Sequence, residues 1–381
     1  MKGYFRKRGS TWSFTIDLGR DEKTGKRKQK TKSGFKTKKD AERACNELIN
    51  QMNKGLYVEP STTTLKEFIM EWMETRAKQV LRPSSYDNHL VVIESHIIPD
   101  LGDYKLVDLT PAHVQRFYSQ KTKQGLSPDY IRYMHNILNK SLKHAAKWEL
   151  IPKNIIELVD PPRLRDKEIQ TWTLEEATEF LEYSKNHGER FYIGYLLAIY
   201  TGMRRGEILG LRWKDCNLKQ AKASIRQTLY RTRQGLIFQE PKTKSSKRQI
   251  SLPQTVVDAL NKYRIRQNTR KLSLGTAYHD HDLIVCTEDG KPVEPRNFVR
   301  HFDRMIKESG SPKIRFHDLR HTHATILLQI GEHPKVVSER LGHSRISVTL
   351  DTYSHVLPDM QKDAAENFEK AMKKMLRKSM S

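Results

Sequence analysis

The sequence has few cysteines and no long apolar run. Three cysteines, Cys45, Cys216 and Cys286, are scattered through 381 residues without a Cys-x-x-Cys pair. This usage fits a reducing interior and argues against both a disulfide framework and a zinc site. No apolar run approaches the ~18 residues that a membrane span needs, and no signal-peptide pattern follows Met1. The sequence therefore predicts a cytoplasmic protein without a membrane partner.

The sequence is also short of acidic residues. Its 69 lysines and arginines outnumber 45 aspartates and glutamates, which gives a formal net charge of +24. An excess of this size attracts polyanions such as DNA or RNA independently of their sequence. Ribosomal and membrane-surface proteins are basic too, so charge alone does not single out the partner. The length indicates two or three domains.

The first part of the chain is the most basic. Residues 1–39 hold 14 lysines and arginines against three acids. Apolar and polar residues alternate from Trp12 to Leu18, which predicts a half-buried strand, and residues 26–32 read as a second, basic strand. A capping pattern at 37–40 then opens a helical repeat. We expect a small sheet backed by one helix over residues 1–58, either a DNA reader or merely a solvated charged face.

The rest of the chain is mainly helical. Capping patterns and first-turn prolines predict a four-helix module over residues 64–158, which alone reads as an ordinary helical bundle. A third module is expected over 170–358, mostly helical with strands near 222–252. In the tail, 359–381, an apolar helical stripe predicts burial against a partner subunit or against its own domain.

A set of chemically matched residues recurs in the third module. His317-Asp318-Leu319-Arg320 is followed by Leu341-Gly342-His343 and then by Tyr353, while Arg204 comes earlier. A guanidinium binds phosphate through two parallel hydrogen bonds and keeps its charge. Histidines handle protons near neutral pH, and a tyrosine hydroxyl can act as a nucleophile. These residue types predict metal-free attack on a phosphodiester.

In this order the motifs resemble those of the tyrosine recombinases, the phage-integrase family. The resemblance implies a multidomain, mainly α fold with small β-sheets: a sheet-plus-helix DNA-binding domain for arm sites, a helical core-binding domain and a mixed α/β catalytic domain. It implies site-specific cleavage and rejoining of DNA through a 3′-phosphotyrosyl intermediate, which integrates and excises a mobile element such as a viral genome. The catalytic residues that it implies are Arg204, Lys244, His317, Arg320, His343 and Tyr353.

The resemblance also implies the partners. These are double-stranded DNA attachment sites, three further copies of the chain in a tetramer, and accessory factors that bend DNA or set the direction. No metal and no other cofactor is implied. His321, His323 and His355 lie near the motifs, but their spacing and the lack of a carboxylate cluster argue against a metal site.

The resemblance implies a separate role for each of these catalytic residues. Tyr353 is the nucleophile, Arg204 and Arg320 hold the phosphate, His317 relays a proton and His343 donates to a phosphate oxygen. The general acid is Lys244, or alternatively Lys242, in a predicted hairpin. Arg205 is expected outside the site.

Glu207 is expected to orient its neighbours or simply to form a helix salt bridge. Two other functions remain open at this point. A type IB topoisomerase uses similar chemistry but relaxes supercoils as a monomer, and a non-catalytic DNA-binding regulator only binds.

Overall fold

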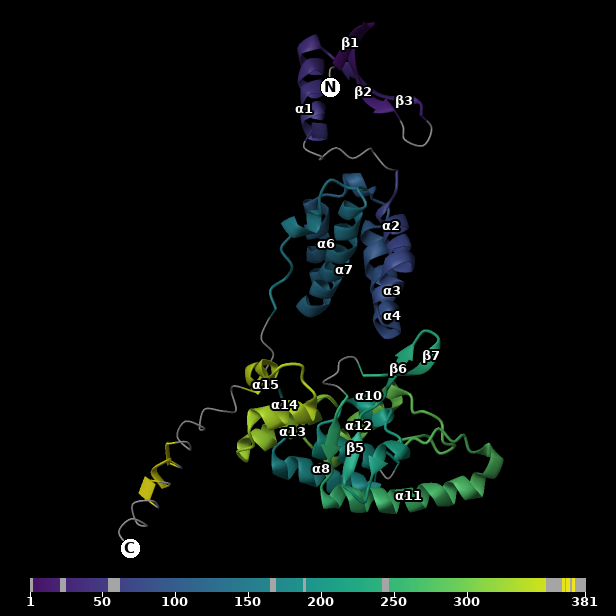
Figure 1. Cartoon of the computed structure of the whole chain (residues 1–381), viewed down its shortest axis with the longest axis vertical. Helices are drawn as coiled ribbons and strands as arrows, with labels where there is room; N and C mark the ends of the chain where they lie inside the picture. Colours follow the sequence, from purple (N-terminus) through teal and green to yellow (C-terminus); the bar gives the residue numbers. More distant parts are fainter. Residues whose placement is uncertain are drawn as a thin grey trace. The chain divides into compact units, whose positions relative to one another are not determined.

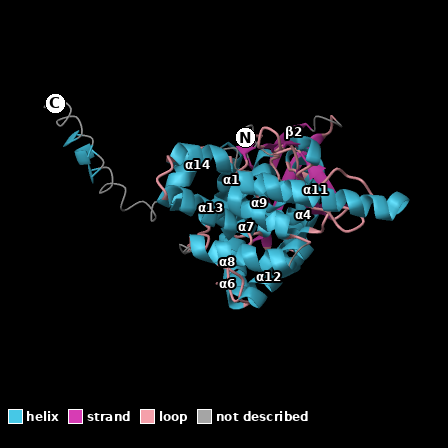
Figure 2. Cartoon of the chain, turned by 90° about the horizontal axis from the view of Figure 1, so that it is seen from below, coloured by secondary structure: helices cyan, strands magenta, loops and turns pink. Residues whose placement is uncertain are grey.

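The computed structural model describes residues 3–20, 25–53, 62–164, 169–187, 190–241, 247–353, 365–366, 368–370 and 372–373. The chain divides into two compact units, Met1–Asp166 and Lys167–Ser381. Helices dominate, and the strands form small antiparallel sheets (Figure 2). This agrees with the fold class that the sequence predicts.

The first unit opens with a three-stranded antiparallel sheet backed by one helix (Figure 1). Apolar side chains from the middle strand, such as Phe14 and Ile16, are fully buried against Cys45 and Leu48 of the helix. The alternation in the sequence therefore marks the face of the sheet that packs on the helix. The elements are β1 (Gly3–Arg8), β2 (Thr11–Arg20), β3 (Arg27–Phe35) and α1 (Lys38–Asn53).

Four helical rods follow in the same unit. Thr64 caps the first rod: its hydroxyl accepts from the backbone N–H of Glu67, and its own N–H donates to the Glu67 carboxylate at 2.8 Å. The first two rods each contain one π-helical turn. The rods are α2 (Leu65–Trp72) with η1 (Met73–Ala77) and α3 (Lys78–Val80); α4 (Pro83–Val92) with η2 (Ile93–Ile97) and α5 (Ile98–Leu101); α6 (Pro111–Lys123); and α7 (Pro128–Lys147).

These rods enclose one apolar core, to which α2, α6 and α7 each contribute large side chains. Phe68, Phe117 and Ile137 are at most 2% exposed. Short 3-10 turns, η3 (Leu106–Asp108) and η4 (Ile155–Leu158), complete the unit. No helix among the described residues is long and apolar enough to cross a bilayer.

The second unit packs helices around a larger core that is rich in aromatic rings. Trp172, Phe180, Tyr195, Phe298 and Phe302 are buried in it and pack edge-to-face or tilted against one another. Such arrangements stabilise a core beyond the area that they bury. The core fixes the central helix α9 (Tyr192–Thr201), whose end carries the candidate site.

The remaining elements of this unit surround that core. Its first helix is capped by Thr173, whose hydroxyl accepts from the N–H of Glu176 at 3.2 Å. The elements in chain order are α8 (Leu174–His187), α10 (Arg205–Leu209), η5 (Trp213–Asp215), β4 (Cys216–Asn217), β5 (Lys222–Ser224), β6 (Thr228–Thr232), β7 (Gly235–Gln239), β8 (Gln249–Ser251), α11 (Gln254–Leu274), η7 (Gly275–Ala277), α12 (Pro295–Ser309), α13 (Asp318–Gln329), α14 (Pro334–Leu341) and α15 (Ile346–Tyr353).

Strand pairing in the second unit is local. The order β4-β5-β8 forms one antiparallel sheet, and β6 and β7 form a separate hairpin. The predicted strands near 222–252 are therefore confirmed. The domain boundaries that the sequence predicts stay predictions.

Candidate active site

The site begins at a sharp turn between α9 and α10. Gly202 ends α9 with a left-handed φ of 64°. A Cβ at this position would lie 2.7 Å from atoms of His323 and Leu341, so only glycine fits. The turn makes Arg204 the residue that precedes the first turn of α10, with extended backbone angles. The side chain of Arg204 therefore starts from the amino-terminal end of α10 rather than from the side of the helix.

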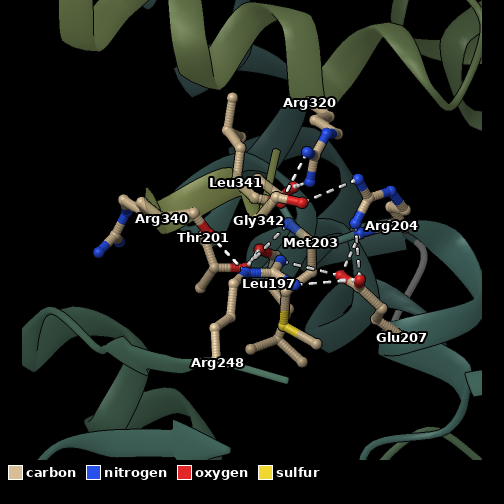
Figure 3. Close-up of polar contacts among 11 residues, drawn as sticks. Leu197, Thr201, Met203, Arg204, Glu207, Arg248, Arg320, Arg340, Leu341 and Gly342 are labelled. Carbon is tan, nitrogen blue, oxygen red and sulfur yellow. Dashed lines mark hydrogen bonds and ion pairs between the residues drawn. The ribbon is translucent and has the colours of Figure 1, made fainter. Parts of the chain in front are cut away.

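Arg204 is held at three points but remains accessible. Its Nη1 donates to the Glu207 carboxylate at 3.0 Å, and its backbone N–H donates to the same group at 2.9 Å. Its Nη2 approaches the carbonyl oxygen of Gly342 at 3.5 Å (Figure 3). The side chain is 37% exposed. A guanidinium fixed in this way is oriented without being enclosed.

Arg320, on α13, meets Arg204 at the same turn. Its Nη1 donates to the carbonyl of Gly202 at 2.8 Å and its Nη2 to that of Leu341 at 2.7 Å. The residue is only 3% exposed. Burial and the nearby charge of Arg204 lower the pKa of Arg320 to about 9, so the guanidinium stays charged at neutral pH. The end of α14 thus gathers two arginines that lie far apart in the sequence.

A buried ion pair lies behind Arg204. Arg248 donates to both carboxylate oxygens of Glu207, at 3.0 and 2.9 Å, and its Nε donates to the carbonyl of Arg340 at 2.6 Å. Burial alone raises the pKa of Glu207, but the hydrogen bonds and charges of Arg248 and Arg204 outweigh it and lower the pKa. Glu207 is therefore ionised, and its carboxylate orients both Arg204 and Arg248.

Two histidines border the arginines. Burial, followed by the charges of Arg320 and Arg204, lowers the pKa of His343 to about 4. Its Nδ1 lies 2.8 Å from the hydroxyl oxygen of buried Thr349. His317 precedes α13 and reaches solvent; desolvation of its ring, followed by the charges of nearby cationic and histidine side chains, lowers its pKa too. Both rings are therefore neutral near pH 7.

Tyr353 is the last residue of α15 and is 1% exposed. Its phenol oxygen lies 2.7 Å from Nδ1 of His321. Burial raises the pKa of Tyr353 to about 12, while the charge of Arg320 acts in the opposite direction. The structure thus places the tyrosine of the motif beside the helix that carries Arg320.

The other histidines of the motif point to different partners. His323 is buried and bonds the carbonyl of Ile199 through Nδ1 at 2.8 Å, whereas His321 bonds Tyr353. Within the part of the chain that the structure describes, no group of three or more histidines, cysteines or carboxylates could hold a metal ion.

Two predicted features fall outside the described residues. Lys244 and Lys242 both lie in the segment 242–246, which the structure does not describe. His355 and most of the tail, 359–381, do not belong to the described part either. What is described on the carboxyl side of the lysine segment is Arg248, anchored to Glu207, and then β8.

Comparison with known proteins gives the family. The model of the phage integrase family matches residues 170–360. An arm DNA-binding domain model matches residues 4–52, and an N-terminal SAM-like domain model of phage integrases matches 64–122. A tyrosine recombinase XerC-like protein of Caldanaerobacter subterraneus is 30% identical over 374 residues, covering 93% of this chain and 95% of the relative. The chain belongs to the phage integrase family.

Other relatives agree with this assignment. The ICEBs1 integrase of Bacillus subtilis is 27% identical over 288 residues and covers 76% of this chain and 78% of its own length. Among solved structures, the Tn1549 transposon integrase in complex with transposon right end DNA has a TM-score of 0.67 at 21% identity, covering 80% of this chain and 99% of that one. A lambda integrase dimer bound to a core site has a TM-score of 0.59 at 18% identity, covering 92% and 93%.

The protein is accordingly a tyrosine-type site-specific DNA recombinase, and neither the topoisomerase nor the regulator alternative is favoured. The prediction from the motifs is confirmed at this level. The roles of the individual site residues stay predictions.

Two residues of the site are not evident from the motifs. In the sequence Arg248 reads only as part of a basic hairpin, although it pairs with Glu207. His321 invites only the interpretation of a metal ligand, although it contacts Tyr353. One signal for His321 exists in the sequence: it follows His317 by four residues, the spacing at which side chains of a helix lie on the same side.

Proposed function

We propose that Tyr353 attacks a DNA phosphodiester and forms a 3′-phosphotyrosyl bond, while the 5′-oxygen leaves as a hydroxyl. The observation that carries this proposal is the meeting of Arg204 and Arg320 at one turn, next to His343. Two fixed guanidinium groups match the charge that develops on the phosphate oxygens during attack. The bond energy is retained in the phosphotyrosine, so the strand can be rejoined without ATP.

The remaining site residues supply protons and hydrogen bonds. Neutral His343 can accept the Thr349 hydroxyl proton at Nδ1, and Nε2–H is then available as a donor to a phosphate oxygen. His317 is neutral and reaches solvent, so it can relay a proton. Glu207 fixes the orientation of Arg204 and takes no part in bond breaking.

Lys244 is proposed as the general acid that protonates the leaving 5′-oxygen, with Lys242 as the alternative. Support comes from the neighbouring residues. Arg248, four residues after Lys244 in the sequence, is anchored to Glu207 beside Arg204. A lysine with a short tether to this point can reach the phosphate that Arg204 holds.

We further propose a modular division of the chain. Residues 1–58 bind arm-type DNA, 64–158 bind core DNA, and 170–358 cleave it. The tail, 359–381, docks on another subunit. The described part of the tail supports this because Phe368 is 69% exposed and Met372 is 48% exposed.

The biological substrate is double-stranded DNA that carries attachment sites, and the reaction integrates and excises a mobile element, such as a viral genome. Four protomers act on two sites, with accessory DNA-bending or directionality factors, in the cytoplasm at the nucleoid. The net charge of +24 supports a DNA partner.

A nicked suicide substrate tests the chemistry. The wild-type protein is expected to become covalently joined to DNA, whereas Tyr353→Phe binds DNA with the same affinity and forms no adduct. An adduct of undiminished yield in Tyr353→Phe would show that another residue is the nucleophile. Topoisomer analysis of a supercoiled plasmid that carries two sites distinguishes recombination from relaxation and from binding alone.

A further inference from the structure

One face of α13 runs from the candidate site to the buried apolar cluster that contains Tyr353. His321, Ala324 and Leu328 share this face, because they follow one another at intervals of three and four residues. His317, four residues before His321, immediately precedes α13 with helical backbone angles and continues the same line. The rings of His317 and His321 lie 5.2 Å apart, edge to face. Tyr353 contacts the same face at His321 and packs with Ala324 and Leu328.

The ring of Tyr353 is enclosed by apolar side chains. Tyr353 forms a buried cluster with side chains from α13 and α14, namely Ala324, Leu328, Val337 and Leu341. Such neighbours fix the plane of a ring by shape but offer no partner for its hydroxyl group. A buried hydroxyl without a hydrogen bond is costly.

His321 provides that hydrogen bond. Its Nδ1 lies 2.7 Å from the phenol oxygen, and the two rings are tilted at a centroid distance of 5.7 Å. Among the described residues, the structure gives the phenol oxygen no hydrogen bond other than this one. The residue is half-buried, and desolvation lowers the pKa of His321, so its ring is neutral and able to accept.

We propose that His321 is a positioning residue for the nucleophile: it accepts the phenol proton of Tyr353 in a hydrogen bond and thereby fixes where the attacking oxygen lies. This inference rests on the proposed role of Tyr353. The bond requires the tautomer of His321 that carries its proton on Nε2. The apolar cluster then fixes the ring plane, and His321 fixes the oxygen along the helix face.

Loss of the hydrogen bond between His321 and Tyr353 is expected to affect the cleavage rate and not DNA binding. Misplacing a reacting atom by about 1 Å can slow a reaction on the order of 100-fold without changing how substrate binds. Loss of the hydrogen bond therefore lowers the rate of cleavage at saturating DNA and leaves DNA affinity unchanged. A merely structural role for His321 would instead reduce the fraction of folded protein and thereby the apparent affinity.

Three variants of the full-length protein separate these roles. The amide oxygen of His321→Asn lies near the position of Nδ1 and can accept from the phenol, whereas the amide of His321→Gln reaches the position of Nε2 instead. His321→Ala removes both. We expect single-turnover cleavage of a nicked suicide substrate to fall roughly 10–100-fold in the Ala and Gln variants and to return to within about threefold of wild type in the Asn variant.

Binding and folding are measured alongside the cleavage rate. Gel-shift affinity for the same DNA is expected to stay near the wild-type value in all three variants. The Tm is expected to stay near the wild-type value in the Asn variant and to fall slightly in the Ala and Gln variants, which leave the buried phenol hydroxyl without its partner. Wild-type cleavage by His321→Ala would overturn the proposal, and so would an Asn variant as slow as the Ala variant. A general loss of Tm and of affinity in all three variants would assign His321 a structural role and would also overturn it.

Tyr353→Phe separates failure of this inference from failure of the proposed function. If Tyr353→Phe forms no adduct and His321→Ala cleaves normally, Tyr353 is the nucleophile and only the positioning role is wrong. If Tyr353→Phe still forms an adduct, the role of Tyr353 is wrong, and the positioning role falls with it.

Discussion

Arg248 donates two hydrogen bonds to Glu207, at 3.0 and 2.9 Å, and both side chains are buried, at 6% and 3% exposure. Glu207 also receives a hydrogen bond from Arg204, the arginine that the motifs assign to the phosphate. The Glu207 carboxylate therefore orients Arg204 and neutralises the charge of the buried Arg248.

Replacement of Glu207 by glutamine is expected to destabilise the second unit. The substitution leaves the buried cation Arg248 without a counter-charge, which typically costs about 3–5 kcal/mol. For a unit of this size that cost corresponds to a fall of roughly 6–20 °C in the Tm. Differential scanning calorimetry of the full chain measures it.

The matched control removes an exposed carboxylate from the same unit. Glu308 pairs with Arg304 at 3.7 Å, and its side chain is 44% exposed. Glu308→Gln is expected to cost less than about 1 kcal/mol. Equal effects of Glu207→Gln and Glu308→Gln would contradict a structural role for the buried pair.

His323 predicts a dependence of stability on pH. It is 6% exposed, its Nδ1–H donates to the carbonyl of Ile199, and its Nε2 accepts from Nε of Arg340 at 3.0 Å. Burial and the charge of Arg340 lower the pKa of His323 to about 3. A second proton on the ring would face the guanidinium, so the folded state holds His323 neutral.

The direction in which pH changes the free energy of unfolding depends on whether the folded or the unfolded chain binds more protons. Between the unfolded pKa, about 6.5, and the lower folded pKa, the unfolded chain binds the extra proton. The free energy of unfolding therefore falls as the pH falls through this window, by up to about 1.4 kcal/mol per pH unit for one histidine. Urea denaturation of the second unit at a series of pH values measures this slope.

His323→Asn isolates this contribution. Its amide N–H can still donate to the carbonyl of Ile199, but the side chain no longer titrates. We expect a flatter slope below about pH 6.5 in this variant than in the wild-type protein. An unaltered slope in His323→Asn would mean that other groups cause the pH dependence.

Local sequence patterns predict the elements well where a short-range interaction determines them. Thr64 with Glu67, at the start of the predicted four-helix module, forms the hydrogen bonds of a capping pattern. The alternation from Trp12 to Leu18 predicts β2 because period two is enough to bury one face of a strand. The fold class is predicted in a different way. The short motifs occur in the same order as in the tyrosine recombinases, and the resemblance implies the fold of that family.

Pairings between distant residues are not predictable in this way. The pairing of Glu207 with Arg248 joins residues 41 positions apart in the sequence, and no local pattern encodes it. The position of Arg204 before α10 depends on the turn at Gly202, which itself fits between side chains of the distant residues His323 and Leu341. The hydrogen bond of His321 with Tyr353 likewise arises only when α15 packs on α13. Side-chain pairing across elements follows from the tertiary packing alone.

The identity of the general acid is tested by changing the leaving group. A 5′-bridging phosphorothiolate leaves as a thiolate and needs no proton, so it bypasses the acid. Lys244→Ala is expected to cleave ordinary DNA at a rate on the order of 100-fold below that of the wild type. On the phosphorothiolate substrate it is expected to regain most of the wild-type rate. Rescue of Lys242→Ala in its place would move the role to Lys242.

The amino-terminal module is expected to act on DNA outside the cleavage site. A fragment that begins at residue 60 is expected still to cleave short core-site DNA but to lose integration on long attachment sites. Integration by this fragment at the wild-type rate would mean that the basic sheet is only a solvated face.

The open face of the sheet gives the sharper form of this prediction. Phe5 of β1 packs against the core with α1, so Arg6 and Arg8 project from the opposite face, and both are exposed. Removing one cation that neutralises a DNA phosphate reduces the slope of log affinity against log salt concentration by about 0.9. Arg6→Gln with Arg8→Gln is therefore expected to weaken arm-site binding and to lower this slope by up to about 1.8.

Lys38→Gln with Lys39→Gln, at the start of α1 on the other side of the sheet, removes the same charge. If the open face binds DNA, this control changes the slope much less. Equal changes in the two double variants would show that the module attracts DNA through its net charge alone.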